Sequence, residues 1–441
     1  MSVKVRLTLM SFLQFFVWGA WLITIGTYCF NAKGWTGAEF GAIFSTLGLS
    51  SLFMPAITGI IADKWLNAEK LYGLLHIIYG CVMFYVPSVN DPDTLYYVIF
   101  AAMICYMPTI SLSNSIAYTI LKNSKFDVVK DFPPIRVFGT IGFIVAMWFT
   151  NIFSSDNPPA IFHDFGLKVG NYLANVFGSS INANQFYIAA FFAVILGIYS
   201  FTLPKCPPQK LISENASFAE SLGLNAFKLF SNSKMALFLL FSLFLGAALQ
   251  LTNMYGDAYL DDFGKVEQYK DSFVVQGRTF IMSISQFSET LFILAIPFFL
   301  KRFGIKQVML FSMIAWVLRF GLFSFGNPDD GLWMIILSCI VYGMAFDFFN
   351  ISGSLFVETT TDSKIRSSAQ GLFMMMTNGV GAYLGSTLSG LVIDKFFTQD
   401  NVKDWQGIWL SFAIYAAIIM VLFAIFFKHK HNPEDVAQVS H

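Results

Sequence analysis

The sequence predicts an all-α polytopic membrane protein with twelve transmembrane helices, arranged as two halves of six. Hydrophobic residues make up 56% of the 441-residue chain and charged residues only 12%, against about 25% charge in a typical soluble domain. Twelve apolar runs, each long enough to cross a bilayer, are separated by polar connections. Most of the surface must therefore face lipid, which leaves little chain for a separate soluble domain.

The apolar runs follow one another along the whole chain. They cover residues 7–30, 39–62, 71–90, 94–121, 133–154, 185–203, 234–260, 273–300, 307–326, 331–358, 367–394 and 405–427. Lys4 and Arg6 precede the first run, which is longer than the apolar core of a signal peptide and has no small-residue cleavage site. We therefore expect the first run to be retained as a membrane helix.

Positive charge is distributed unequally between the two sides that these runs define. Lys and Arg gather in the connections on the side of the N-terminus, for example at Lys64, Lys122 and Lys301, and are few on the other side. Cytoplasmic loops carry such an excess of Lys and Arg. The sequence therefore predicts an even number of spans, with both termini in the cytoplasm.

The runs also divide the chain into two halves of nearly equal length. Residues 1–203 form the first six-helix bundle, and residues 234–441 form the second bundle with a short cytoplasmic tail. The polar connector 204–233 is predicted to be a cytoplasmic linker, with a short amphipathic helix over Ser221–Phe230 on the inner surface. The long outer connection 155–184 is rich in Asn, Gly and Ser and is expected to be a loop or a small cap.

Two six-helix halves joined by a cytoplasmic linker resemble the organisation of the major facilitator transporters. Between the second and third runs, Gly59-Ile-Ile-Ala-Asp63-Lys64 resembles the GxxxD(R/K) loop of that superfamily. Gly59 is expected to permit close helix contact, and Asp63 to accept hydrogen bonds from a neighbouring helix N-terminus and lock an inner gate. The equivalent segment of the second half, Leu300–Gly304, lacks the acidic residue.

Several apolar runs contain polar residues at helical spacing. A charge inside the membrane is costly, so each such residue is a candidate functional group. The sets that share a helix face are Gln250 with Asn253, Gln286 with Glu289, Asp347 with Asn350, Tyr342 with Phe346, and Arg136 with Thr140 and Phe143. Such stripes can together line a water-filled cavity.

Simpler interpretations of these residues stay open. The amides could bond neighbouring helices, Arg136 could be a positive anchor at the inner surface, and any one Phe could pack against lipid or protein. Arg319 could be a structural partner for Asp347 or Glu289. Glu289, a carboxylate in the middle of an apolar run, is the hardest to explain without a function.

The sequence also excludes several classes of function. It contains no HExxH or GxSxG motif, and no P-loop that would indicate an ATP-driven pump. The five cysteines form no CxxC pair, so we expect neither a disulfide framework nor a zinc site, and no cofactor. The 27 Lys and Arg balance 27 Asp and Glu, which disfavours nucleic-acid binding.

Long blocks of residues resemble the nucleoside:proton symporter family of the major facilitator superfamily over almost the whole length. These blocks are Ser11–Phe15, Phe53–Ala56, Ala62–Leu66, Asp131–Arg136, Gly139–Phe143, Ile281–Gln286, Ser288–Phe292, Ala345–Ser352 and Met374–Gly379. The resemblance implies a permease of the bacterial inner membrane. It would import nucleosides, such as uridine or adenosine, with protons, and we expect a monomer.

The resemblance also implies which residues bind the substrate. These are Arg136, Thr140, Phe143, Gln250, Asn253, Gln286, Glu289, Tyr342 and Phe346, with Asp347 alongside. Their chemistry suits a nucleoside, because amides match the donors and acceptors of base edges and aromatic rings stack on bases. A carboxylate in the site would repel phosphate, so nucleotides should be poor substrates.

The expected mechanism is alternating access coupled to a proton. Either Glu289 or Asp347 could carry that proton; we assign substrate contact to Glu289 and the proton to Asp347. Two alternatives remain at this point: a proton-coupled oligosaccharide transporter on the same fold, which would also suit Arg, Glu, Asn and aromatic residues, and a membrane-embedded enzyme or receptor.

Overall fold

The structure is a computed structural model and describes residues 2–208, 224–362 and 365–430. The chain folds into two compact units, each of which is described here by itself. Unit 1 consists of Met1–Leu222 and Asn253–Phe280, and unit 2 consists of Gly223–Thr252 and Ile281–His441. The short segment Asn253–Phe280 thus packs with the N-terminal unit, although the helix that contains Asn253 begins in unit 2.

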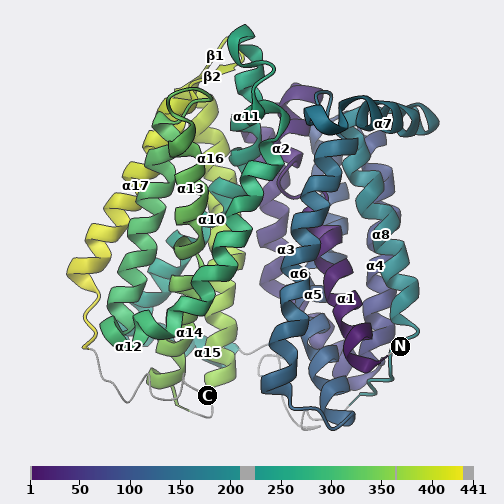
Figure 1. Ribbon diagram of the computed structural model, residues 1–441. Coiled ribbons are helices and arrows are strands. Elements are labelled where there is room, and N and C mark those ends of the chain that lie inside the picture. Colours follow the sequence, from purple (N-terminus) through teal and green to yellow (C-terminus); the bar gives the residue numbers. More distant parts are fainter. Residues whose placement is uncertain (1, 209–223, 363–364, 431–441) are drawn as a thin grey trace. The chain divides into compact units, whose positions relative to one another are not determined.

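Unit 1 is a bundle of long helices with short helical turns at their ends (Figure 1). Its α-helices are α1 (Val3–Gly19), α2 (Ile25–Thr27), α3 (Gly37–Lys64), α4 (Ala68–Tyr85), α5 (Pro92–Asn123), α6 (Val128–Phe153), α7 (His163–Phe177), α8 (Asn184–Ser200) and α11 (Phe273–Gln276). Its 3-10 helices are η2 (Val86–Ser88), η3 (Ala160–Phe162), η4 (Ile181–Ala183), η6 (Phe263–Lys265) and η7 (Glu267–Tyr269), and η1 (Tyr28–Ala32) is a π-helix. Helix α1 packs on α6 and α8, α4 packs on α5 and α8, and α3 packs on α5.

Small residues let α1 and α6 approach each other closely. A Cβ atom on Gly142 of α6 would lie only 2.1 Å from the backbone oxygen of Phe12 in α1. A Cβ atom on Gly19 at the end of α1 would lie 2.5 Å from the backbone oxygen of Phe143. Glycine is therefore required at both positions for this helix pair, as is common between membrane helices.

Two segments of unit 1 differ from the sequence expectations. The first apolar run is not one helix, because α1 ends at Gly19 and the chain continues through a turn into α2 and η1. The outer connection 155–184 contains a 15-residue helix, α7, where a loop or small cap was expected. This helix ends at Gly178, whose φ of 63° gives the left-handed conformation that glycine adopts at helix ends.

Unit 2 contains the remaining long helices. Its elements are η5 (Leu224–Ser231), the first part of α10 (Ser233–Asp262), α12 (Arg278–Phe325) from Ile281 onward, α13 (Leu332–Ala345), α14 (Asp347–Thr360), α15 (Arg366–Met374), the π-helix η8 (Met375–Gly381), α16 (Ala382–Phe397), β1 (Thr398–Gln399), β2 (Val402–Lys403) and α17 (Trp405–Phe426). The strands β1 and β2 form a small antiparallel hairpin. Asp400 and Asn401 have positive φ at its two-residue turn, as a type I′ turn requires.

Two apolar runs of unit 2 are interrupted at points that hydropathy did not indicate, whereas the bend in α12 lies where a connection was expected. Helix α12 holds the expected spans 273–300 and 307–326 in large part and bends between them at Gly304, where φ is 79° and ψ is 170°. The run 331–358 is broken at Phe346 into α13 and α14, and the run 367–394 is broken by the π-helix η8. In the linker, Leu224–Ser231 forms a 3-10 helix, and Ser221–Gly223 of the predicted amphipathic helix lie outside the described residues.

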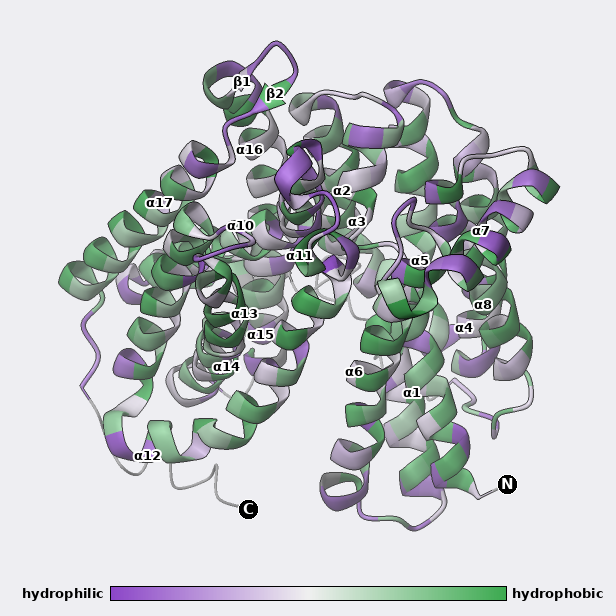
Figure 2. Cartoon of the chain, turned by 45° about the horizontal axis from the view of Figure 1, so that its top comes forward, coloured by the Kyte–Doolittle hydropathy of each residue, from purple (hydrophilic) through white to green (hydrophobic). Residues whose placement is uncertain are grey.

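Within the described ranges, nine helices are long and apolar enough to cross a membrane. One of them, Arg278–Phe325, contains two of the expected crossings because of its bend. Helix α1 is 17 residues long, and the segment of α15, η8 and α16 is interrupted, which explains why these two expected spans are not among the nine. Hydrophobic residues predominate along the long helices, and hydrophilic residues gather near their ends (Figure 2).

Candidate functional site

In unit 1, the expected substrate residues of α6 lie on the side of the helix that meets α1. The guanidinium carbon of Arg136 stacks 3.9 Å from the ring centroid of Phe15 in α1. A Cβ atom on Gly139 would lie 2.7 Å from Arg136 Nη1, so the glycine makes room for the guanidinium. Arg136 and Thr140 are half-buried, and Phe143 is buried. Arg136 is therefore held by packing between two helices, which a simple surface anchor would not require.

In unit 2, several expected site residues meet around the buried side chain of Tyr342. The Tyr342 hydroxyl shares a hydrogen bond with the side chain of Gln286. The charged side chains that interact electrostatically with this hydroxyl are Glu289, Arg319 and Asp347. Three helices therefore contribute to one polar cluster: Gln286, Glu289 and Arg319 come from the two parts of α12, Tyr342 from α13, and Asp347 from α14.

Close packing of α12 on α13 brings these residues together. A Cβ atom on Gly343 would lie 2.4 Å from Ser288 Oγ, and Ser288 Oγ donates a hydrogen bond to the carbonyl oxygen of Ile340. Glu289 directly follows Ser288 in the sequence, and Tyr342 directly precedes Gly343. Their approach therefore follows from the small side chains of the contact.

Phe346 and Asp347 lie at the break between α13 and α14. Phe346 precedes the first residue of α14, which is Asp347. The carbonyl oxygen of Ala345, at the end of α13, accepts a hydrogen bond from Ser312 Oγ. A helix N-terminus favours negative charge, and interrupted helices commonly form ligand sites in secondary transporters. The break thus places a buried carboxyl group where a transported ion or substrate could reach it.

Arg319 is fully buried beside this cluster. Its guanidinium carbon lies 4.1 Å from the ring centroid of Phe323 and 5.3 Å from that of Tyr342. Its Nη1 donates to Ser338 Oγ at 3.3 Å. Two rings and a hydroxyl therefore contact the guanidinium, and its partnership with Asp347 or Glu289 stays a prediction.

The remaining expected substrate residues lie on α10. Gln250 is buried in the part of α10 that belongs to unit 2, and Asn253 is half-buried at the point where the helix joins unit 1. Their i,i+3 spacing does place them one turn apart on a continuous helix, as the sequence predicts.

The sequence of this chain matches one known family over nearly its whole length. The model of the family described as "Nucleoside H+ symporter" matches residues 1–432. The chain belongs to the nucleoside H+ symporter family.

Similar proteins agree with this membership. The xanthosine permease of Escherichia coli (strain K12) is 49% identical over 437 residues, which cover 99% of this chain and 98% of the permease. The nucleoside permease NupG of the same organism is 46% identical over 444 residues, which cover 100% of both chains. The crystal structure of NupG superposes with a TM-score of 0.85 and covers 98% of this chain and 100% of that chain.

Several sequence expectations are thereby confirmed. A bacterial homologue of the human lysosomal transporter Spinster has a TM-score of 0.70 at 13% identity, covering 96% of this chain and 95% of that chain, which shows the same fold alone. The chain is a multi-pass α-helical membrane protein with the major facilitator fold, and a transporter rather than an enzyme. Its substrates are nucleosides and protons. The alternatives of a sugar transporter and of a membrane enzyme or receptor are set aside.

The expected gating residues of this symporter lie at the end of α3. Gly59, Asp63 and Lys64 all belong to the last turns of that helix. In the described ranges, no atom comes within 4 Å of a Cβ atom built on Gly59, so the close helix contact expected there is absent. Asp63 is half-buried and makes no hydrogen bond or ion pair with any described residue. The expected bond to a helix N-terminus is therefore not formed in this conformation.

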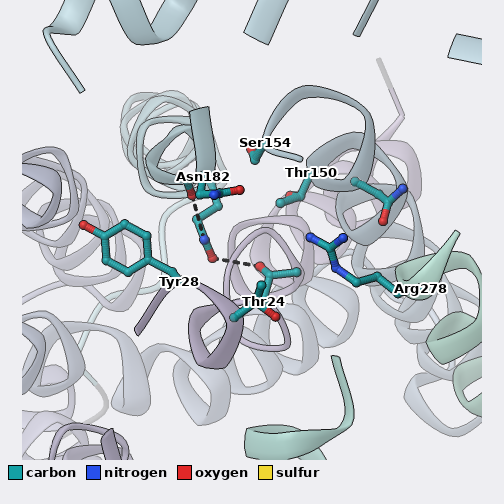
Figure 3. Close-up of a pocket in the computed structure, with 9 residues that line it drawn as sticks. Thr24, Tyr28, Thr150, Ser154, Asn182 and Arg278 are labelled. Carbon is teal, nitrogen blue, oxygen red and sulfur yellow. Dashed lines mark hydrogen bonds between the residues drawn. The ribbon is translucent and has the colours of Figure 1, made fainter. Parts of the chain in front are cut away.

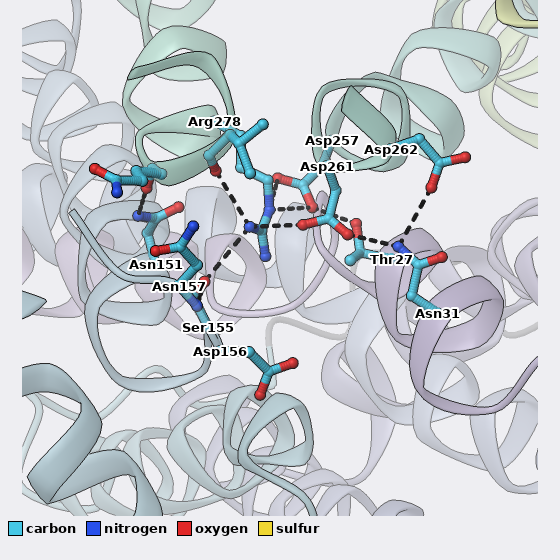
Figure 4. A network of polar contacts seen from close by, with 12 residues as sticks. Thr27, Asn31, Asn151, Ser155, Asp156, Asn157, Asp257, Asp261, Asp262 and Arg278 are labelled. Atoms are coloured by element: carbon cyan, nitrogen blue, oxygen red, sulfur yellow. Dashed lines mark hydrogen bonds and ion pairs between the residues drawn. The ribbon is translucent and has the colours of Figure 1, made fainter. Parts of the chain in front are cut away.

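Sequence reasoning missed a buried charge network in unit 1 (Figure 4). Arg278 lies between two acids of α10: its Nε is 3.2 Å from Asp257 Oδ1, and its Nη1 is 2.8 Å from Asp261 Oδ1. Thr27 Oγ1 donates to Asp257 Oδ2 at 2.5 Å, and Asn31 Nδ2 donates to Asp261 Oδ2 at 2.5 Å. The i,i+4 spacing of the two acids is the one signal that could have indicated this cluster.

Further contacts attach the same segment to α6. Asn151 Nδ2 donates to the carbonyl oxygen of Gln276 at 2.8 Å, and Thr279 Oγ1 donates to that of Met147 at 3.0 Å. Arg278 Nη1 also reaches Ser155 Oγ at 3.4 Å. These bonds explain why Asn253–Phe280 forms part of unit 1.

A small polar cavity adjoins this network (Figure 3). Its lining includes Thr24, Thr150, Asn182 and Arg278, and Thr24 Oγ1 donates to Gln185 Oε1 at 2.7 Å beside it. Its volume of about 10 Å³ is close to that of one water molecule. A nucleoside does not fit, so this cavity is not the substrate site.

Proposed function

We propose that this symporter binds its nucleoside, such as uridine or adenosine, against the Tyr342 cluster of unit 2, and that Asp347 carries the coupled proton. The observation that supports the proposal is the meeting of Tyr342 with Gln286, Glu289 and Asp347 beside the break in the helix. A hydrogen-bonding amide, an aromatic ring and a carboxylate in one place are the groups that a nucleoside requires.

Each group of the cluster has a distinct task in this proposal. The Gln286 amide offers both a donor and an acceptor to the edge of a base. Tyr342 and Phe346 offer rings for stacking, which contributes about 1–3 kcal/mol per base on aromatic side chains. Glu289 accepts hydrogen bonds from ribose hydroxyls, and its charge opposes the binding of a nucleotide phosphate. We propose further that Arg136, Thr140, Phe143, Gln250 and Asn253 contribute to nucleoside binding during the transport cycle.

The proton supplies the driving force in this scheme. Asp347 is buried within a membrane helix, where an ionisable residue commonly belongs to a proton or ion pathway. One proton that moves with a neutral nucleoside carries one charge, for which the membrane potential supplies about 2.3 kcal/mol per 100 mV. This corresponds to an accumulation of about fiftyfold.

We also propose how the chain is placed in the membrane. The excess of Lys and Arg on one side supports cytoplasmic termini in a bacterial inner membrane. Alternating access would involve the six-helix halves 1–203 and 234–441, joined by the cytoplasmic linker 204–233. Gly59, Asp63 and Lys64 would act at the inner gate in a conformation other than the present one. A monomer is sufficient for this mechanism.

The test compares Glu289→Gln and Asp347→Asn in sealed proteoliposomes. We expect wild-type protein to give an inward positive current on a solid-supported membrane when uridine, and then adenosine, is added. Asp347→Asn should lose proton-driven accumulation but keep nucleoside counterflow, which needs substrate binding without net proton movement. Glu289→Gln should lose both, with a raised KM for counterflow. Glu358→Gln is the matched control, because Glu358 is a half-exposed acid on α14 that pairs with Arg366 outside the cluster.

Two results would contradict the assignment. Loss of proton-driven uptake in Glu289→Gln together with unaffected Asp347→Asn would give the proton to Glu289. Tracer uptake without any current would mean that net charge does not move with the nucleoside, so that transport is electroneutral exchange or uniport.

A further inference from the structure

A basic basin lies at one end of unit 2, away from the Tyr342 cluster. Its lining residues are Lys234, Lys306, Lys428, His429 and Lys430, around a cavity of about 690 Å³. They come from three distant segments: the start of α10, the part of α12 after the bend at Gly304, and the chain that follows α17. Figure 1 shows the end of α17 and the bend of α12 at the same end of this unit. A cavity of this volume falls within the range of ligand sites.

The fold holds several of these cations in place. Lys306 Nζ donates to the carbonyl oxygen of Ala424 at 2.9 Å, in the last turn of α17, where carbonyl groups lack a partner within the helix. Lys234 Nζ donates to His429 Nδ1 at 3.0 Å and lies 5.3 Å from the ring centroid of Phe356. The spacing of the basin's cations is therefore set by contacts between α10, α12, α14, α17 and the chain that follows α17.

Among the residues that the structure describes, no acid lines the basin. Every residue that lines it is basic. In the described ranges, Lys306, Lys428 and Lys430 form no ion pair with a carboxylate. Like charges that converge on one cavity repel each other, and an anion in the basin would convert that repulsion into attraction.

We propose that the basic basin binds the phosphate groups of an anionic phospholipid, and binds a headgroup with two phosphates more tightly than one with a single phosphate. Basic pockets at the cytoplasmic ends of membrane helices suit such headgroups. The surface beside the basin supports a lipid as the source, because Leu422, Ile425 and Phe426 in the last turns of α17 are 40%, 58% and 58% exposed. Acyl chains can lie along these side chains while the headgroup lies in the basin.

This proposal is independent of the nucleoside site, so it can be tested without transport. Full-length protein in detergent is mixed with diphosphatidylglycerol, phosphatidylglycerol, phosphatidylcholine or inorganic pyrophosphate, and lipid retention is measured by native mass spectrometry, with Tm as a second readout. The test variant is the triple replacement Lys306→Gln, Lys428→Gln and Lys430→Gln. The control variant is Lys301→Gln with Arg302→Gln, which removes two exposed cations before the bend in α12 that do not line the basin.

We expect wild-type protein to retain diphosphatidylglycerol over phosphatidylcholine and to gain thermal stability from it. The triple variant should bind diphosphatidylglycerol about a hundredfold more weakly, since each lysine near an anionic surface contributes a factor of about five. The control variant should stay close to wild type. If the triple variant is poorly folded, Lys428→Gln alone, at an exposed position beyond α17, should still weaken binding about fivefold.

Three results would overturn the proposal. Equal losses in the triple and control variants would mean that general surface charge, and not the basin, attracts the lipid. Protection by pyrophosphate equal to that by diphosphatidylglycerol would keep a phosphate site but remove the lipid as its source. Retention of all three lipids to the same extent would exclude selection for an anionic headgroup or for a second phosphate, because phosphatidylcholine carries one phosphate and no net charge.

Discussion

Replacing Arg278 by methionine should leave the buried carboxylate of Asp257, in unit 1, without its ion-pair partner. In the structure, the side chain of Arg278 is 6% exposed and that of Asp257 is 0% exposed, with Arg278 Nε 3.2 Å from Asp257 Oδ1. Asp261 is the second acid that pairs with this guanidinium: its Oδ1 lies 2.8 Å from Arg278 Nη1, and its side chain is 20% exposed. Methionine has a similar length and no charge, so the replacement removes the compensating charge with little change in packing.

The magnitude follows from the burial of each acid. Removing one partner of a buried ion pair costs about 3–5 kcal/mol, because the remaining charge has neither water nor a partner. Of its contacts with described residues, Asp257 would keep the hydrogen bond from Thr27 Oγ1. Asp261 is 20% exposed and should add less than about 1 kcal/mol. We therefore expect Arg278→Met to lower the free energy of unfolding by about 3–5 kcal/mol, most of it from Asp257.

The assay is a double-mutant cycle on unfolding by SDS, with Arg278→Met, Asp257→Asn and the double variant. The double variant should recover much of the stability lost in Arg278→Met, because Asp257→Asn removes the buried charge that has lost its partner. Arg366→Met is the matched control: Arg366 is 38% exposed and pairs at 3.0 Å with Glu358, which is 46% exposed, and loss of such an exposed pair should cost about 1 kcal/mol or less. A cost for Arg278→Met no larger than that of the control, or strictly additive variants, would refute the reasoning.

Two further predictions concern packing and the linker. Gly142→Ala should cost about 1–3 kcal/mol of stability, because the new Cβ would lie 2.1 Å from the backbone oxygen of Phe12. The control Gly321→Ala meets no described atom within 4 Å and should be neutral or stabilising by up to about 1 kcal/mol. Equal thermal stabilities of these two variants would contradict the prediction. Burial, followed by the nearby Glu69 carboxylate, raises the pKa of the Cys206 thiol to about 12, so the thiol stays protonated at pH 8. N-ethylmaleimide should therefore label Cys206 in SDS-unfolded but not in folded protein, as judged by peptide mass spectrometry, and rapid labelling of folded protein would show that the thiol is accessible and ionised.

The boundaries of the membrane helices were largely predictable, but their interruptions were not. Composition and hydropathy located the apolar runs, since each span must be apolar whatever it packs against. The breaks at Phe346 and Met375–Gly381 left no trace in this pattern, because the apolar residues continue on both sides of each break. Helix α7 was missed for the opposite reason: its mixed composition lacks the hydropathy of a span.

The candidate site was predictable one helix at a time. Spacing placed Gln286 with Glu289 and Tyr342 with Phe346 on single helix faces, and the structure gathers Gln286 and Glu289 around Tyr342. The ring of Phe323 and the hydroxyl of Ser338 beside Arg319 were not predicted, because a buried guanidinium can be stabilised by rings and hydroxyls as well as by carboxylates.

By itself the sequence determined that this protein is a helical membrane transporter, and which faces of its helices carry polar residues. Lipid acts on each helix separately, since a span must be apolar and must satisfy its own backbone hydrogen bonds, so these properties can be recognised locally. Only the tertiary structure decided which buried charges meet: that Arg278 lies between Asp257 and Asp261, and that lysines from three segments share one basin. Such partners are chosen by close helix packing at small residues far apart in the chain, and no local pattern records that choice.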